Sequence, residues 1–231
     1  MANPKTLTTE ECCDLLRSIR SNYITAPQER KCIRNYTIAL LMLDAGLRVG
    51  EVVHLRISDL LFNSVPVTSI IIRSEIAKNK TERIIPVSER LSNAIKKMLE
   101  SYWSAADQFV NYWAIGSLNA STHLTTRQVE RIIKAAAMKS LGRPIHPHIL
   151  RHTFGTRIER KAGIRVAQEL LGHKNLSSTQ IYTHPNQDDL KKAIDSLPAI
   201  QEAGCYDSFL SAPDTDRPNR PDTPRTDRDM G

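Results

Sequence analysis

The sequence predicts an α+β fold that is mostly α-helical, with one small antiparallel β-sheet of about three strands. Two observations lead to this expectation. The first is a series of apolar segments of helical length that begin at capping residues and end at glycine or polar turns. The second is a run of β-branched residues in which PVTSIIIR and RIIPV flank the polar turn AKNKTE, a pattern typical of a hairpin. The nearby segment ISDLLF is the candidate for a third strand.

The expected helices lie on both sides of this hairpin. Threonines ahead of two glutamates form a favourable cap and predict a helix over about 8–20. A second helix is expected at about 27–45, and Gly46 fits the left-handed position past its end. The stretch 104–122 is ambiguous, with FVNYW as a candidate short strand. Further helices are expected at about 49–55, 88–103, 125–140, 148–162, 165–171, 176–183 and 188–197.

Composition favours one compact domain. A chain of 231 residues with 40% hydrophobic residues can bury one core, which we place in residues 1–200. No apolar run is long enough to span a membrane, and the first residues lack the apolar segment of a secretion signal. The four cysteines follow neither a disulfide framework nor a zinc-binding spacing. A cytoplasmic location is therefore expected.

Charge divides the chain near residue 200. Residues 201–231 hold four arginines against seven acids, a net charge of −3, and this Pro/Asp/Arg-rich tail is expected to be disordered. Because the whole chain carries +7, residues 1–200 carry +10. A domain this basic fits a polyanionic partner such as nucleic acid, although many basic proteins bind no polyanion.

Two residues near the end of the domain indicate nucleophilic chemistry. Tyr182 lies in SSTQIYTH, and His173 stands nine residues earlier, directly after Gly172. A free phenol has a pKa of about 10, so it attacks near neutrality only beside bases or cations. A helix that ends in Gly-His can present an imidazole to the tyrosine of the next helix. The alternatives are a plain helix cap and an ordinary half-buried tyrosine.

His148 and Arg151 are three residues apart on one expected helix and therefore share a face. An arginine fork can bind two phosphate oxygens at once, and a neighbouring imidazole can bond to the same group or transfer a proton. His152 is expected to support this pair through hydrogen bonds. A solvated helix face is the alternative.

Three more charged residues join the candidate site. Arg48 follows a helix end in AGLRVGE and would be a second phosphate clamp, its guanidinium held by Glu51 of the next short helix. Lys78 and Lys80 lie in the turn of the hairpin, where an ammonium group could reach into a groove. The alternatives are a purely structural Arg–Glu pair and ordinary turn lysines.

These motifs, taken together and in this order, resemble the catalytic domain of the tyrosine recombinases, the lambda-integrase-like family. AGLRVGE resembles the first arginine box of the family, and KNKTERIIP resembles its lysine-bearing hairpin. HILRHTFGT resembles the His-x-x-Arg box, with Ile149 where the family often has aspartate, and LLGHKNLSSTQIYTH resembles the last box. The likeness covers about residues 8–196.

The resemblance implies a role for each residue. Tyr182 would be the nucleophile that joins the 3′ phosphate of DNA and releases a 5′ hydroxyl. Arg48 and Arg151 would stabilise the charge that develops on the phosphorus. His148 and His173 would position the phosphate and assist proton removal from the phenol.

Lys78 would protonate the leaving 5′ oxygen, with Lys80 as the fallback. The resemblance also implies that neither a metal nor ATP, nor any other cofactor, is needed. The expected partner is a double-stranded DNA recombination site bound by a homo-tetramer, which is weakly associated or monomeric without DNA.

Only 47 residues precede Arg48, so a short form without the N-terminal core-binding domain of most relatives, or an excised fragment, is expected. Two other functions stay open at this point. One is DNA relaxation by a type IB topoisomerase, and the other is a DNA-binding regulator that does not cut.

Overall fold

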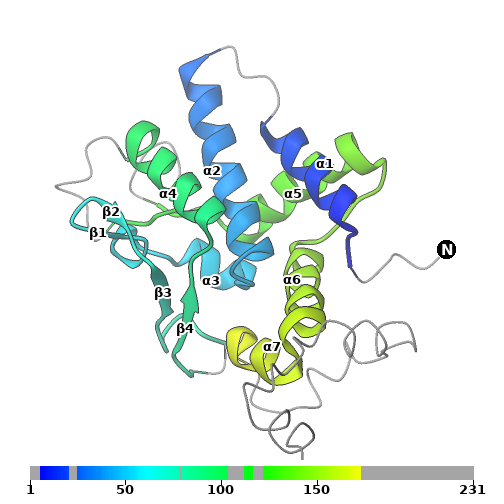
Figure 1. Ribbon diagram of the computed structural model, residues 1–231. Helices are drawn as coiled ribbons and strands as arrows, with labels where there is room; N and C mark the ends of the chain where they lie inside the picture. The colour runs from blue at the N-terminus through cyan, green and yellow to red at the C-terminus, as the bar shows by residue number, and fades with distance from the viewer. Residues whose placement is uncertain (1–5, 21–24, 79, 104–111, 117–121, 173–231) are drawn as a thin grey trace, which may run out of the picture. The chain divides into compact units, whose positions relative to one another are not determined.

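The computed structural model describes residues 6–20, 25–78, 80–103, 112–116 and 122–172 (Figure 1). The helices in this part of the chain are α1 (Thr9–Arg20), α2 (Ala26–Leu43), α3 (Val49–Val53), α4 (Glu89–Ser101), α5 (Thr126–Leu141), α6 (Pro147–Ala162) and α7 (Ile164–Leu171). The strands are β1 (Leu61–Phe62), β2 (Val65–Pro66), β3 (Ser69–Ile72) and β4 (Arg83–Pro86), and a 3-10 turn, η1 (Ile57–Asp59), precedes β1. The mostly helical α+β fold is confirmed.

Helix ends lie where the capping residues predict them. At the start of α1, the Thr8 hydroxyl accepts a hydrogen bond from the Glu11 backbone N–H at 3.2 Å. The Glu11 carboxylate accepts in return from the Thr8 N–H at 3.0 Å, so two donors of the first turn are satisfied. After α2 the chain turns through Gly46, whose φ is +62°. Each expected helix among the described residues is present, with bounds that differ by no more than two residues.

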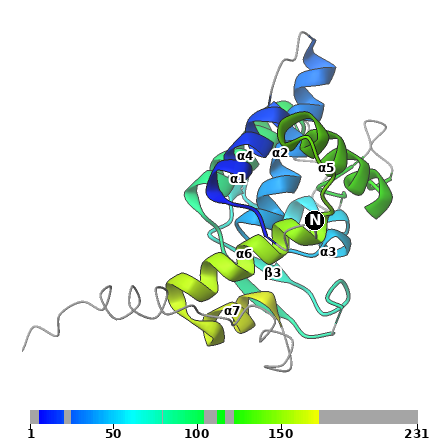
Figure 2. The same cartoon turned by 90° about the vertical axis from the view of Figure 1, so that its right-hand side faces the viewer.

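The helix α2 forms the centre of the core. All six side chains of residues 38–43 are at most 1% exposed. α2 packs against α1, α4 and α6, while α1 also packs on α5 and α6 on α7 (Figures 1 and 2). Burial of apolar surface is the main force that holds these helices together. The segment that follows α2, with Gly46 and Arg48, is therefore attached to the most deeply buried helix.

The strands β3 and β4 form an antiparallel pair in which Ser69 lies opposite Pro86 and Ile72 opposite Arg83. Successive side chains of a strand point to opposite faces. Ile70 and Ile72 are accordingly buried, whereas Ile71 is 47% exposed. One face of the hairpin thus packs on the core, and the register fixes both ends of the turn that carries the two lysines.

The sheet differs from the expectation in one respect. β1 and β2 pair with each other, so the described strands form two separate two-stranded sheets rather than one sheet of about three strands. The cause is a two-residue turn at Asn63 and Ser64, whose φ values of +48° and +58° suit a tight hairpin. Pro66 also lacks the N–H group that a further strand would need.

Some expectations fall wholly or partly outside the described residues. Of the candidate strand FVNYW, only Tyr112 and Trp113 are described, and Trp113 forms an isolated antiparallel bridge with Arg56. The helices expected at 176–183 and 188–197, the tail at 201–231, and His173 and Tyr182 lie outside the described residues. The boundary at residue 200 stays a prediction.

The described helices include none with the length and apolar character needed to cross a lipid bilayer.

Gly46→Ala is expected to lower the free energy of unfolding by about 2–5 kcal/mol, from left-handed strain and overpacking together. The added Cβ would lie 2.3 Å from Cδ1 of Phe154. Gly142→Ala is the matched control, because its φ is +65° but no atom lies within 4 Å of the new Cβ. It should cost only about 1–2 kcal/mol, the strain of the backbone. Urea unfolding followed by circular dichroism measures both, and equal losses would contradict the role of Phe154.

Candidate active site

Arg48 is held by the first turn of α3. Its backbone N–H donates to Oε2 of Glu51 at 2.8 Å, and its guanidinium Nη1 donates to Oε1 at 2.9 Å. One carboxylate therefore fixes both the backbone and the side chain of Arg48, as the sequence predicts. The Arg48 side chain remains 20% exposed.

Glu51 is the buried centre of the charged group and is 1% exposed. Arg83 binds it through two hydrogen bonds, of 2.9 Å to Oε1 and 2.6 Å to Oε2, and Nη1 of Arg151 lies 3.9 Å from Oε2. Burial alone would raise the pKa of this carboxyl. The hydrogen bonds and charge of Arg83, the Arg48 N–H and the charge of Arg151 outweigh burial and hold the pKa below its usual value. Glu51 is thus ionised, and three guanidinium groups surround one negative charge.

Arg151 reaches the same region from α6. Its side chain is 3% exposed. Nη1 donates to the carbonyl of Gly46, and Nη2 donates to the carbonyl of Leu171 at 2.6 Å. These bonds tie α6 to the turn after α2 and to the last residue of α7, so the guanidinium is held in one orientation.

His148 lies one turn before Arg151 on α6. Its ring packs edge-on against His152, with centroids 4.1 Å apart, so His152 supports it through ring contact. Partial burial, and then the positive charges of Arg151, Arg48 and Lys78, lower the pKa of the His148 imidazole below its usual value. The imidazole is therefore mainly neutral at pH 7 and able to accept a proton.

These residues border one cleft of about 470 Å³. The predicted site residues that line it are Arg48, Glu51, Lys78, His148 and Arg151. Lys80 is not among the described residues that line it, which favours Lys78 over Lys80 as the lysine of the candidate site. Cations on several sides and a neutral imidazole suit an anion with several oxygens, such as a phosphodiester.

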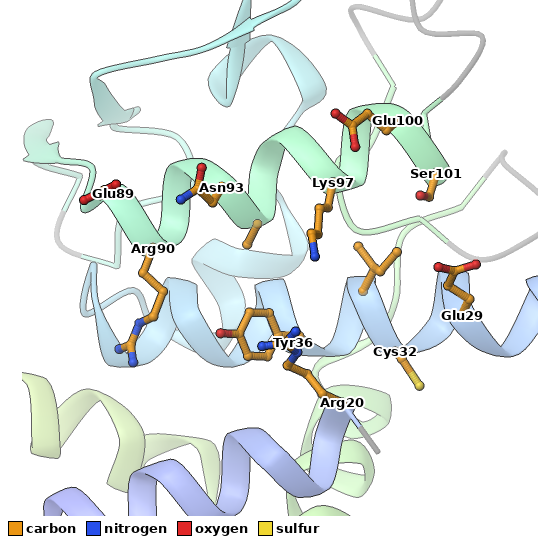
Figure 3. Close-up of a pocket in the computed structure, with 12 residues that line it drawn as sticks. Arg20, Glu29, Cys32, Tyr36, Glu89, Arg90, Asn93, Lys97, Glu100 and Ser101 are labelled. Carbon is orange, nitrogen blue, oxygen red and sulfur yellow. The ribbon is translucent and has the colours of Figure 1, made fainter. Parts of the chain in front are cut away.

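A second cavity, of about 540 Å³, lies between α2 and α4 (Figure 3). Its three basic side chains, Arg20, Arg90 and Lys97, are matched by three glutamates. Arg90 is paired with Asp44, and Arg20 lies over the ring of Tyr36 at 5.3 Å. None of the predicted site residues described by the structure lines this cavity, so the smaller cleft is the candidate site.

Sequence patterns did not indicate Arg83, the first residue of β4. Its side chain is 4% exposed and joins the group through Glu51. A signal was present in the strand RIIP, because Ile85 faces the core and the residue two positions earlier must share its face. An arginine on a buried face needs an anionic partner.

The family of this chain can be read from comparison with known proteins. A sequence profile of the phage integrase family matches residues 5–189, which is most of the chain. The chain belongs to the phage integrase family. The resemblance to the tyrosine recombinases is thereby confirmed, together with the fold that it implies.

Relatives of known name are tyrosine recombinases. The chain is 38% identical over 164 residues to tyrosine recombinase XerD of Rickettsia bellii, an alignment that covers 67% of this chain and 52% of the relative. It is 34% identical over 199 residues to tyrosine recombinase XerA of Pyrococcus horikoshii, covering 86% of this chain and 63% of the relative. The chain thus spans between about half and two thirds of the length of these relatives.

Solved structures share the fold. The crystal structure of XerA recombinase matches with a TM-score of 0.62 and 30% identity, over 83% of this chain and 65% of that one. XerH recombinase, bound to its difH substrate in a pre-cleavage complex, matches with a TM-score of 0.64 and 24% identity, over 84% and 54%. The second likeness is one of fold alone.

Glu51→Gln is expected to lower the free energy of unfolding by about 3–5 kcal/mol, because it leaves buried guanidinium groups without their anion. Asp14→Asn is the matched control, since Asp14 pairs with Arg17 on the surface, where the two side chains are 46% and 76% exposed. The control should change stability by less than about 1 kcal/mol. Chemical unfolding at pH 7 measures both, and a small loss in Glu51→Gln would contradict the central role of this carboxylate.

His148 should make stability depend on pH. In the unfolded chain the pKa of this imidazole is about 6.5, and in the folded chain it is lower. Between the two pKa values the unfolded chain binds a proton that the folded chain does not. The free energy of unfolding should therefore fall as the pH drops below about 6.5. Unfolding curves between pH 5 and 8 are expected to show a weaker decline for His148→Gln than for the wild type. Identical declines would contradict the lowered pKa.

Proposed function

We propose that this chain is the catalytic domain of a site-specific DNA recombinase, which cuts and rejoins DNA strands through a 3′-phosphotyrosyl intermediate. The observation that carries the proposal is the cleft in which two arginines, a neutral histidine and a lysine meet. These side chains come from the residue that caps α3, from α6 and from the β3–β4 hairpin, and they match the order of the family motifs. Membership of the phage integrase family and relatives named tyrosine recombinases support it.

Arg48 and Arg151 would bind the non-bridging oxygens of the scissile phosphate. Both are held before DNA arrives, Arg48 by Glu51 and Arg151 by two backbone carbonyls. Donors that are already oriented stabilise charge in a transition state without further reorganisation. The exposed fraction of Arg48 suits it to turn toward the phosphate.

In the proposed reaction, the phenolic oxygen of Tyr182 attacks the phosphorus. A bond forms between this oxygen and phosphorus while the bond from phosphorus to the 5′ oxygen breaks. The phenolic proton passes to His148 or His173, and Lys78 gives a proton to the leaving 5′ oxygen. A 5′ hydroxyl from a partner duplex then attacks the phosphotyrosine, and the bond energy is conserved without ATP or a metal.

The proposed partner is double-stranded DNA with a recombination site, bound by a tetramer of this chain on two duplexes. The charge of +10 on residues 1–200 supports an anionic partner and predicts an affinity that falls steeply with salt. The cytoplasm is the proposed place of action, because the substrate is DNA.

A covalent adduct is the decisive test. Nicked suicide duplexes with randomised flanking sequence are incubated with the protein, treated with SDS, and the protein-linked DNA is sequenced. The wild type should form an adduct with a common sequence, and Tyr182→Phe should form none. Arg151→Lys should slow adduct formation by about 100–1000-fold, as expected for loss of one oriented donor fork. Arg157→Lys, an exposed arginine on the same helix, is the matched control and should react at the wild-type rate.

Three outcomes separate the alternatives. Adduct formation followed by joining to a second duplex supports recombination. Adduct formation with relaxation of supercoiled plasmid, but without joining to a partner, would indicate a type IB topoisomerase. DNA binding without any adduct would indicate a regulator and overturn the proposal.

A further inference from the structure

Arg83 makes three hydrogen bonds that connect separate parts of the fold. Two of them go to the carboxylate of Glu51, at 2.9 and 2.6 Å. In the third, Nε donates to the backbone carbonyl of Leu170, at 3.0 Å. One guanidinium therefore links the hairpin, through β4, to α3 and to the last turn of α7.

The three arginines around Glu51 differ in how firmly they hold it. Arg83 is bound through both of its terminal nitrogens, and its side chain is 4% exposed. Arg48 donates one guanidinium bond and is 20% exposed, while Arg151 lies 3.9 Å away and donates to backbone carbonyls. A bidentate, buried pair is the one that persists when a competing anion enters. Arg83 can thus keep Glu51 neutralised when Arg48 turns to a phosphate.

The end of α7 is fixed by two arginines at consecutive carbonyls. Arg83 binds the carbonyl of Leu170, and Arg151 binds that of Leu171. Gly172 follows with φ of +62°, and a Cβ at this position would lie 2.9 Å from Cδ of Arg83. The close approach therefore requires glycine. His173 is the next residue along the chain.

We propose that Arg83 is a positioning residue for strand cleavage. Its two hydrogen bonds to Glu51 keep that carboxylate neutralised, which leaves Arg48 able to bind the phosphate. Its bond to the Leu170 carbonyl anchors the C-terminal end of α7, from which the chain continues to His173. This inference rests on the proposed function but adds a residue that touches neither DNA nor the reacting atoms. Lysine cannot replace it, because an ammonium group lacks the planar fork that reaches both the carboxylate and the Leu170 carbonyl.

Hydrogen–deuterium exchange tests the anchoring without DNA. In Arg83→Met, the amides of residues 167–172 should exchange about tenfold faster, because the last turn of α7 loses the hydrogen bond from Arg83 to the Leu170 carbonyl. Arg83→Lys keeps the charge and the fold, and it should show the same change in a smaller degree. Arg73→Met is the matched control, since Arg73 lies on the same hairpin and pairs with Asp59 and the His54 carbonyl. The control should leave exchange in 167–172 unchanged.

Single-turnover adduct formation tests the effect on cleavage, with the suicide duplex selected by the wild type. At saturating DNA, Arg83→Lys and Arg83→Met should react about 10–100-fold more slowly, because small displacements of oriented groups are costly. DNA affinity should stay at the wild-type value, since the Arg83 side chain is buried and offers no surface to a DNA strand. Arg73→Met should react at the wild-type rate.

The double variant Arg83→Met/Glu51→Gln separates charge balance from anchoring. It removes one charge of each sign, so the net charge of the group equals that of the wild type, while fast exchange and slow cleavage should persist. Wild-type cleavage in the double variant would show that Arg83 acts only as a counterion and overturn the anchoring role. Unchanged cleavage in Arg83→Lys would overturn the positioning role. If the wild type itself forms no adduct, the proposed function fails, and exchange in 167–172 still decides the anchoring.

Discussion

The carboxylate of Glu51 is the interaction on which the site depends. Three guanidinium groups lie close together at this site, and like charges repel one another when little water separates them. One buried negative charge, shared by Arg48, Arg83 and Arg151, holds them in place. The carboxylate also caps α3 through the Arg48 N–H, so local helix structure and site electrostatics depend on the same side chain.

Backbone carbonyls also hold the arginines in place, by accepting hydrogen bonds from Arg83 and Arg151. Arg151 donates to the turn after α2 and to the end of α7, and Arg83 donates to the residue just before that end. Each bond satisfies a carbonyl at or near a helix terminus, where intrahelical partners are lacking. The arginines thus order the chain around them as well as the charge between them. The core built on α2 supplies the rigid base for both.

Local patterns were sufficient for much of the fold and for part of the site. The caps at Thr8 and the left-handed Gly46 depend on a few neighbouring residues, so they could be predicted. The motif order likewise indicated Arg48, Lys78, His148 and Arg151, which line one cleft. Arg83 was missed because its partner Glu51 is 32 positions away, and no spacing rule connects a strand residue to a helix cap. The pairing of β1 with β2 was missed because it depends on positive φ at Asn63 and Ser64, neither of them glycine.

The hydrogen bond from Arg151 to the Gly46 carbonyl joins parts of the chain that are 105 positions apart. A nascent polypeptide that ends before α6 would carry Arg48 and Glu51 but lack this guanidinium. A fragment that begins after α4 would contain Arg151 without the Gly46 carbonyl that receives it. Neither half contains the complete set of residues that line the cleft, so premature termination or proteolytic cleavage between the halves leaves no piece with the whole site.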